Sequence, residues 1–366
     1  MEKTKRLDYL DMAKGFGIIL VVLGHMEDIA TGTRVWISSF HMPLFFMISG
    51  ILMAVKNEQE RDLLQCLKKR YRGIIIPYLW FSLSYFIIDI GNLYVVRNID
   101  LHTFIVDTIS SATFYGMSVL WFLPALFLAS VGFLFLKKKI PDAVIAPLII
   151  VSALVSYVIR IRLEFVYEAN SDSLFITSII NIAYTLLRAV VALSFVGYGF
   201  YAKKLADRLM LTGSKAVKFM CSKPGSLIFG VVLLCINIRL AMLNDCVDLR
   251  NILLNNIWIY YIGAFTGCFG VILICRALPG IRLIEYFGRN SLIVMACHIN
   301  YYFLYAGLRL AWIVDSFNNH AKHYVFVAVT VITVFALSVV VIEVINRFFP
   351  FVLGKGRIRL PGDRNA

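Results

Sequence analysis

Ten long apolar runs constrain this 366-residue chain more than any other feature of its sequence. A helix needs about 20 apolar residues to cross the hydrocarbon core of a bilayer. Only 16% of the residues are charged, against about 25% in soluble domains, and the mean hydropathy is +0.79. We therefore predict an all-α, polytopic transmembrane helical bundle of about ten spans, forming one domain over residues 1–366. The predicted spans are 8–25, 36–55, 73–96, 119–136, 143–160, 174–201, 226–243, 253–275, 290–313 and 324–349.

The distribution of basic residues predicts the orientation of these spans. Cytoplasmic loops of membrane proteins carry an excess of Lys and Arg. With the N-terminus inside, 25 of the 36 Lys and Arg residues fall in inner segments. The outer segments hold six, namely Arg34, Arg97, Arg160, Arg162, Arg250 and Lys322. We therefore predict that both termini are cytoplasmic. The net charge of +14 then reflects topology and contact with membrane lipids, and no nucleic acid partner is needed to explain it.

Cysteine spacing and repeats exclude some function classes. The seven cysteines are scattered, and no C-x-x-C pair is present, so neither a disulfide framework nor a metal site is predicted. No internal repeat is visible, so the inverted-repeat plan of many transporters gains no support.

The first span carries a lysine and a histidine eleven residues apart, Lys14 and His25. Eleven residues make about three helical turns, so both side chains share one face, roughly 16 Å apart along the axis. Asp11 and Ile18 fall on or near the same stripe. Ionisable side chains in a membrane helix are costly and usually face a cavity, a pathway or a partner. The spacing favours a functional role for His25 over a simple interhelical hydrogen bond.

Other polar residues gather at the two ends of the predicted bundle. His41, Trp121 and Asp89 fall toward its outer side, where they would form a polar, aromatic mouth. Lysines and arginines of the run 68–72 fall at its inner side and include Lys69, Arg70 and Arg72. Each has a simpler alternative: Trp121 could belong to an interfacial aromatic belt, and the basic run could be a topology anchor.

Arg188 and His298 are expected near the middle of the membrane, in the sixth and ninth spans. Arg188 has no in-helix partner at i±3 or i±4, so it should bond another helix, a bound anion or water. For His298, as for His41, a helix–helix hydrogen bond and a functional role are both open.

Five stretches of the chain resemble the acyltransferase-3 family of bacterial membrane acyltransferases, which modify cell-surface glycans and related molecules. They occur in the family's order from Arg6 to Tyr302, and HMPLFFMISG is similar to the branch of fucose O-acetylase-like proteins. The five are RLDYLDMAKGFGIILVVLGH, HMPLFFMISGIL, KKRYRGIIIPYLWF, LWFLPALF and YFGRNSLIVMACHINYY.

The resemblance transfers to this chain residue by residue. The family's basic residue, ten others and histidine correspond to Lys14 and His25, and its late histidine to His298. Its R-x-x-R motif appears as Lys69-Arg70-Tyr71-Arg72, so a lysine replaces the first arginine and the bidentate fork is lost there. The resemblance implies a multi-pass protein of the bacterial cytoplasmic membrane. No metal is implied.

Acyl transfer to a hydroxyl needs a base, oxyanion donors and alignment of the two reactants. The leading hypothesis places the phosphates of cytoplasmic acetyl-CoA against Lys69, Arg70 and Arg72, with the acyl-bearing arm along the Lys14 face. His25 would be the base for a hydroxyl of a glycan or lipid-linked sugar on the outer side, since its pKa lies near neutrality.

Further roles complete this hypothesis. Trp121 would stack on the sugar, and Arg188 or His298 would stabilise the oxyanion. A covalent acyl-histidine is an open alternative to direct transfer, and the acyl group is open between acetyl, succinyl and other short groups. Two other classes of protein compete with this hypothesis. One is an exporter or flippase of a polysaccharide or lipid-linked intermediate, and the other is a nonenzymatic scaffold.

Overall fold

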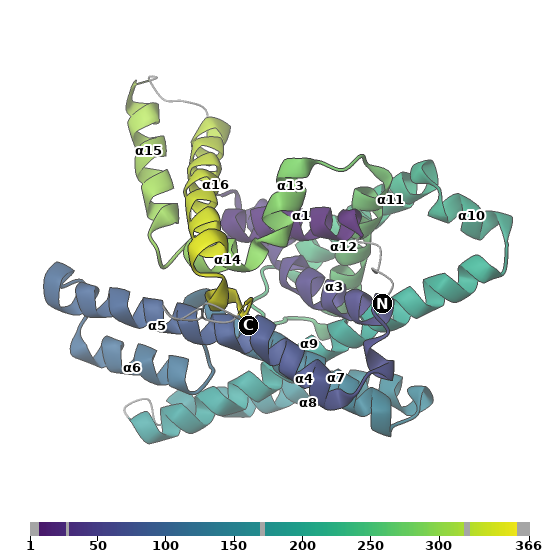
Figure 1. Ribbon diagram of the computed structural model, residues 1–366, viewed down its shortest axis with the longest axis horizontal. Helices are drawn as coiled ribbons and strands as arrows, with labels where there is room; N and C mark the ends of the chain where they lie inside the picture. The colour runs from purple at the N-terminus through teal and green to yellow at the C-terminus, as the bar shows by residue number, and fades with distance from the viewer. Residues whose placement is uncertain (1–6, 27–28, 169–172, 318–322, 357–366) are drawn as a thin grey trace, which may run out of the picture.

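The computed structural model describes residues 7–26, 29–168, 173–317 and 323–356. Within these residues the regular secondary structure consists of helices, joined by short non-helical connections, and the only β-type pairing is an isolated bridge between Asp248 and Leu253. The predicted all-α bundle is confirmed (Figure 1). Some of the basic residues that contribute to the predicted orientation lie outside the described residues, namely Lys3, Lys5, Arg6, Lys322, Arg357, Arg359 and Arg364.

The helices follow one another with short connections. The N-terminal half contains α1 (Asp8–Gly24), α2 (Thr31–Ser38), α3 (His41–Val55), α4 (Leu63–Arg70), the π-helix η2 (Tyr71–Ile75), α5 (Ile76–Gly91), the π-helix η3 (Asn92–Val96), α6 (Leu101–Ala112), the 3₁₀-helix η4 (Ser118–Trp121), α7 (Phe122–Lys139) and α8 (Asp142–Glu168). The rest contains α9 (Leu174–Leu211), α10 (Lys215–Cys221), α11 (Lys223–Asn244), α12 (Ile257–Ala277), α13 (Arg282–Arg289), α14 (Ser291–Cys297), α15 (Phe303–Phe317), α16 (His323–Phe348) and the 3₁₀-helix η5 (Pro350–Leu353). A further 3₁₀ turn, η1 (Glu58–Glu60), joins α3 to α4.

Eight helical segments among the described residues are long and apolar enough to cross a membrane, and they coincide with eight of the ten predicted spans. The first predicted span is α1, a helix of 17 residues, which is at the short end of the spanning range. The ninth, 290–313, differs from the prediction because it is not one helix. It consists of α14 and α15, separated by residues 298–302.

Side-chain hydrogen bonds explain why the ninth span is interrupted. Tyr302 adopts a left-handed backbone conformation (φ 60°), which is uncommon outside glycine. Its hydroxyl donates to Asn92 Oδ1 at 2.6 Å, and the Tyr301 hydroxyl donates to Ser84 Oγ at 2.7 Å. The Tyr85 hydroxyl donates to the carbonyl of Ala296. Side chains of α5 and η3 therefore hold the interruption that carries His298. A hydropathy pattern alone does not show such contacts.

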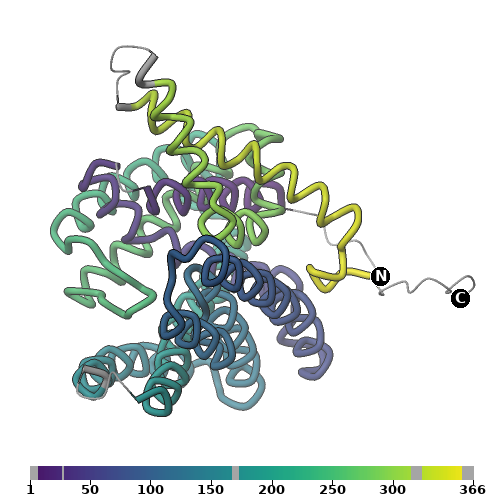
Figure 2. Tube along the Cα trace, turned by 90° about the vertical axis from the view of Figure 1, so that its left-hand side faces the viewer, coloured from purple at the N-terminus to yellow at the C-terminus, as the bar shows by residue number. Residues whose placement is uncertain are grey.

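Helices α3 and α9 pack closely at the centre of the structure. A Cβ added to Gly50 would lie 1.9 Å from the Val196 carbonyl oxygen, and one added to Gly199 would lie 2.1 Å from that of Met47. Small residues let membrane helices approach in this way. α1 contacts α3, α12, α13 and α14, so it lies inside the bundle, whereas α15 and α16 pair with each other (Figure 2).

Candidate functional site

One face of α1 lines two cavities in succession. Lys14, Ile18 and Val21 line the first cavity, and Val21 and His25 line the second. These positions recur at three- and four-residue steps, which is the spacing of one helical face. The predicted common face of Lys14 and His25 is therefore present, and the two residues lie at the two ends of a path along α1.

The first of these, here called the inner cavity, has a volume of about 400 Å³ and is mostly apolar. Its polar residues include Lys14, Lys56, Glu58, Lys69 and Arg70, which belong to α1 or to the connection between α3 and η2. Lys14 Nζ also pairs with Asp11 Oδ1 at 2.7 Å. The inner cavity thus has a charged end and an apolar remainder.

Glu58 organises the charged end. Its carboxylate pairs with Lys69 Nζ at 2.8 Å and with Arg70 Nη2 at 2.6 Å. Burial raises the pKa of the Glu58 carboxyl, but the Arg70 guanidinium and the Lys69 ammonium together bring this pKa below its ordinary value. Glu58 therefore holds two of the three predicted donor-binding cations in place.

The third of these cations, Arg72, lies in a different cavity. This basic cavity of about 650 Å³ is lined by Lys68, Lys69, Arg72, Arg289 and Lys355, and the described residues that line it include no acidic one. Gly354 approaches closely here, since a Cβ on it would lie 1.9 Å from the Arg72 carbonyl oxygen. The predicted cluster is therefore divided: Arg70 faces the inner cavity, Arg72 faces the basic cavity and Lys69 lines both.

The basic and inner cavities adjoin. Lys69, Gly73 and Leu292 line both of them. Gly73 belongs to η2, and such π-turns within α-helices often occur at functional sites. A long ligand could place anionic groups in the basic cavity and extend an apolar arm into the inner one.

The outer cavity has a volume of about 420 Å³ and contains the aromatic residues predicted for the outer mouth. His25, His41 and Trp121 line it. Arg34, Asp248 and Arg250 line it too, and none of these three was predicted as a site residue. In the sequence, only their position in polar loops pointed to them. Asp248 and Arg250 lie between the seventh and eighth predicted spans, and Arg34 lies between the first and second.

Backbone carbonyls fix the tautomers of three histidines. Nδ1 of His25 lies 2.8 Å from the Val21 carbonyl oxygen, and Nδ1 of His41 lies 2.7 Å from that of Ile37. Nδ1 of His298 lies 2.7 Å from the Met295 carbonyl oxygen. A carbonyl only accepts, so in each neutral ring Nδ1 carries the proton and Nε2 keeps its lone pair. His25 is exposed to the outer cavity, so its Nε2 is available as a base.

His298 is buried directly behind His25. Its Nε2 lies 3.3 Å from Nδ1 of His25, and the two ring centroids are 5.0 Å apart. Because Nδ1–H of His298 is directed to a carbonyl, its ring offers a lone pair to His25 and no proton to a substrate oxygen. This geometry supports His298 as an orienting partner of His25 and does not support the predicted oxyanion role.

Arg188 is fully buried, and its contacts join α9 to the wall of the outer cavity. It donates from Nε to the Arg250 carbonyl at 2.5 Å and from Nη1 to the Tyr115 carbonyl at 2.9 Å. Its guanidinium also lies 5.6 Å from the centre of a Trp121 ring. Arg188 does not line the outer cavity. It therefore stabilises the Arg250 loop and Trp121 from outside this cavity.

Asp89 also lies outside the outer cavity. It is buried on α5 and accepts a hydrogen bond from Asn92 Nδ2 at 3.2 Å. Asn92 in turn accepts from the Tyr302 hydroxyl. Asp89 therefore supports the interrupted segment after His298 and does not reach the space beside His25.

The structure brings together an imidazole, an aromatic-lined cavity on one side of it and an apolar path toward cationic groups on the other. These features, in a bundle of membrane-spanning helices, define a multi-pass membrane protein with a site suited to group transfer.

The family model Acyl_transf_3, described as an acyltransferase domain, matches residues 7–343. The chain therefore belongs to this family and is a membrane acyltransferase. No curated protein and no solved structure matches it.

Proposed function

We propose that this protein moves an acetyl or similar short acyl group from acyl-CoA on the cytoplasmic side to a hydroxyl of a cell-surface glycan or lipid-linked sugar on the outer side. The protein would do so in the bacterial cytoplasmic membrane, with both termini inside. The observation that carries the proposal is the meeting of the inner and outer cavities along the face of α1 that presents Lys14 and His25.

The basic cavity supports the choice of coenzyme A as the acyl carrier. Coenzyme A combines phosphates with a long, thin thiol-bearing arm. Lys68, Arg72, Arg289 and Lys355 supply cationic groups for the phosphates, and charge-assisted hydrogen bonds to phosphate are strong. The arm would continue past Lys69 and Gly73 into the inner cavity, with its thioester near Val21.

The outer cavity supports a sugar as the acceptor. Trp121 offers an aromatic face, and Asp248, Arg34 and Arg250 offer polar groups for hydroxyls. Its volume of about 420 Å³ lies within the usual range of small-ligand sites. One sugar unit of a larger acceptor could enter it.

The reaction then needs one base at the junction of the two cavities. The acceptor hydroxyl oxygen attacks the thioester carbonyl carbon, and its proton passes to Nε2 of His25. The new C–O bond forms as the C–S bond breaks, and the proton is returned to the sulfur to give free coenzyme A. His298 Nε2 accepts from Nδ1–H of His25 and so stabilises the imidazolium while it exists.

A test uses the full-length protein purified and reconstituted in phospholipid vesicles. Acetyl-CoA labelled in the acetyl group is supplied on the side of Lys138, and methyl glycosides of fucose, galactose, glucose and N-acetylglucosamine are supplied on the other side. The expected result is labelled glycoside in the wild-type protein and little in His25→Ala. Label found on the protein before acceptor is added would instead indicate an acyl-histidine step.

The exporter alternative predicts a different outcome of the same test. It requires that a glycoside or lipid-linked sugar crosses the bilayer unmodified, with no dependence on acetyl-CoA. The family match favours the acyltransferase. Transport without acyl transfer in this assay would overturn the proposal.

A further inference from the structure

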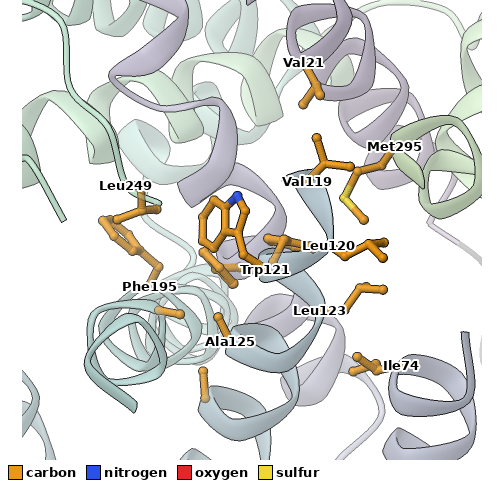
Figure 3. Close-up of a cluster of buried hydrophobic side chains, with 14 of the residues drawn as sticks. Val21, Ile74, Val119, Leu120, Trp121, Leu123, Ala125, Phe195, Leu249 and Met295 are labelled. Atoms are coloured by element: carbon orange, nitrogen blue, oxygen red, sulfur yellow. The ribbon is translucent and has the colours of Figure 1, made fainter. Parts of the chain in front are cut away.

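Three of the described residues form the boundary that the inner and outer cavities share. Val21, Met42 and Met295 line both of them. They come from α1, α3 and α14, and Val21 and Met295 are part of the buried core shown in Figure 3. We call these three residues the septum.

The septum also holds the two histidines through its backbone. The Val21 carbonyl accepts from Nδ1–H of His25, and the Met295 carbonyl accepts from Nδ1–H of His298. Each of these two septum residues therefore lines both cavities and also fixes one imidazole through its carbonyl group. A thioester carbon attacked beside His25 must come to rest against the septum, and the tail of its acyl group must fit there.

The surroundings of the septum are apolar on the inner-cavity side. Ile18, Phe122 and Leu123 line the inner cavity and belong to the same core cluster as Val21 and Met295, whereas His25, Arg34 and Arg250 make the outer cavity polar. The inner-cavity cation on α1, Lys14, lies seven residues before Val21, which is about 10 Å along the helix. A carboxylate on a short acyl tail held against the inner-cavity side of the septum would thus be desolvated among apolar side chains, which is costly.

From this geometry we infer that the septum is the acyl-group subsite. It accepts short, uncharged acyl groups and excludes those that end in a carboxylate, such as succinyl. Met42 and Met295 set the greatest length of acyl chain that the subsite accepts. The inference rests on the proposed function, because it assumes that acyl-CoA enters the inner cavity. Each methylene beyond the space available in a rigid apolar pocket costs about 10–200-fold in selectivity.

Binding of unreactive thioethers tests this without an acceptor. The full-length protein in detergent micelles is titrated by calorimetry with S-ethyl-, S-propyl-, S-hexyl- and S-(2-carboxyethyl)-coenzyme A. The wild-type protein should bind the ethyl compound at least about 10-fold more tightly than the hexyl compound. It should also bind the propyl compound at least about 10-fold more tightly than its carboxyethyl counterpart.

Septum variants should change the length preference selectively. Met42→Ala and Met295→Ala should bring the hexyl and ethyl affinities within about 3-fold of each other, because each frees several methylene volumes. Met47→Ala is the matched control, since Met47 is fully buried on the same helix as Met42 and lines neither cavity. It should leave the ratio unchanged. Where Met42→Ala does not fold, Met42→Val removes less volume and should shift the ratio in the same direction.

The possible failures are distinguishable. If the wild-type protein binds none of the thioethers and none competes with acetyl-CoA, the proposed function fails. Three results would overturn only the septum inference, provided that the thioethers bind. The hexyl and ethyl compounds could have equal affinities, the carboxyethyl and propyl compounds could have equal affinities, or Met42→Ala and Met295→Ala could leave the hexyl-to-ethyl affinity ratio as it is in Met47→Ala.

Discussion

Nε2 of His298 lies 3.3 Å from Nδ1 of His25, although the two residues are 273 positions apart in the chain. Nδ1–H of His25 is shared between this nitrogen and the Val21 carbonyl, which leaves the lone pair on Nε2 of a residue that lines the outer cavity. The pair resembles the base and orienting group of other acid–base sites, with a neutral imidazole in the place often taken by a carboxylate.

Loss of the base should remove most activity. We expect His25→Ala to lower kcat for acyl transfer by about 10²–10⁴-fold, the usual contribution of a positioned base. Donor affinity should change little, because His25 lies at the opposite end of α1 from Lys14 and the charged end of the inner cavity. Transfer rates and S-ethyl-coenzyme A affinity measure the two effects separately. Wild-type rates in the purified variant would rule out His25 as the base.

A smaller loss is expected for its orienting partner. His298→Ala should lower kcat by about 10-fold, which corresponds to one hydrogen bond of about 0.5–1.5 kcal/mol. His298→Gln can still accept from His25 and should recover part of this loss with an unchanged KM for the donor. If His298 only packs against His25, His298→Gln should be no more active than His298→Ala. A comparison of kcat between the two variants therefore distinguishes an orienting role from a packing role.

The basic cavity should distinguish donors with and without phosphates. Arg72→Ala and Arg289→Ala should each raise the KM for acetyl-CoA, with a cost of about 1–3 kcal/mol for a lost charge-assisted hydrogen bond. Neither should affect acetyl-pantetheine, which lacks the nucleotide phosphates. Lys138→Ala, at an exposed lysine near the end of α7, is the control. An equal effect on both donors would indicate that these arginines act on the fold and not on phosphate.

Glu58 should make stability depend on pH in a defined direction. Burial raises the pKa of this carboxyl, but Arg70 and Lys69 outweigh burial and leave the pKa below its ordinary value. The folded state therefore prefers the ionised form. Its contribution is present above the ordinary pKa of about 4.3 and is lost as pH falls through the lower pKa of the folded state. Thermal unfolding of Glu58→Gln should thus show a lower Tm at neutral pH and a weaker loss of stability on acidification. Glu60→Gln, at an exposed neighbour, should keep the wild-type pH dependence.

Two native cysteines report the orientation of the chain. Cys246 is exposed and lines the outer cavity, and Cys221 ends α10 in the connection between α9 and α11. A membrane-impermeant maleimide should label Cys246 in intact cells and Cys221 only after permeabilisation. Cysteines placed at Arg250 and Lys138 should follow the same two patterns, outside and inside. Labelling of both sites from one side would contradict the predicted topology and the two-sided reaction.

The features that depend on local pattern were predictable from the sequence. Eight of the ten predicted spans match helices of spanning length, because apolar composition over about 20 residues is enough to identify such a helix. The family assignment is confirmed by the family match. The common face of Lys14 and His25 was predictable too, since it follows from helical periodicity alone.

The tertiary structure decided which distant residues share a cavity. It placed His298 against His25 because hydrogen bonds from α5 and η3 interrupt the ninth span. It divided the basic cluster because Glu58 draws Lys69 and Arg70 toward the inner cavity while Arg72 faces Arg289 and Lys355. It also placed Asp89 and Arg188 outside the outer cavity.

The physical reason for this division is the same in each case. Membrane insertion and helical periodicity depend on residues near one another in the chain, so the sequence by itself determined eight of the ten predicted spans and the α1 stripe. Side-chain contacts between helices depend on close packing of particular shapes and polar groups. The boundary that the two cavities share at Val21, Met42 and Met295 therefore exists only in the assembled bundle.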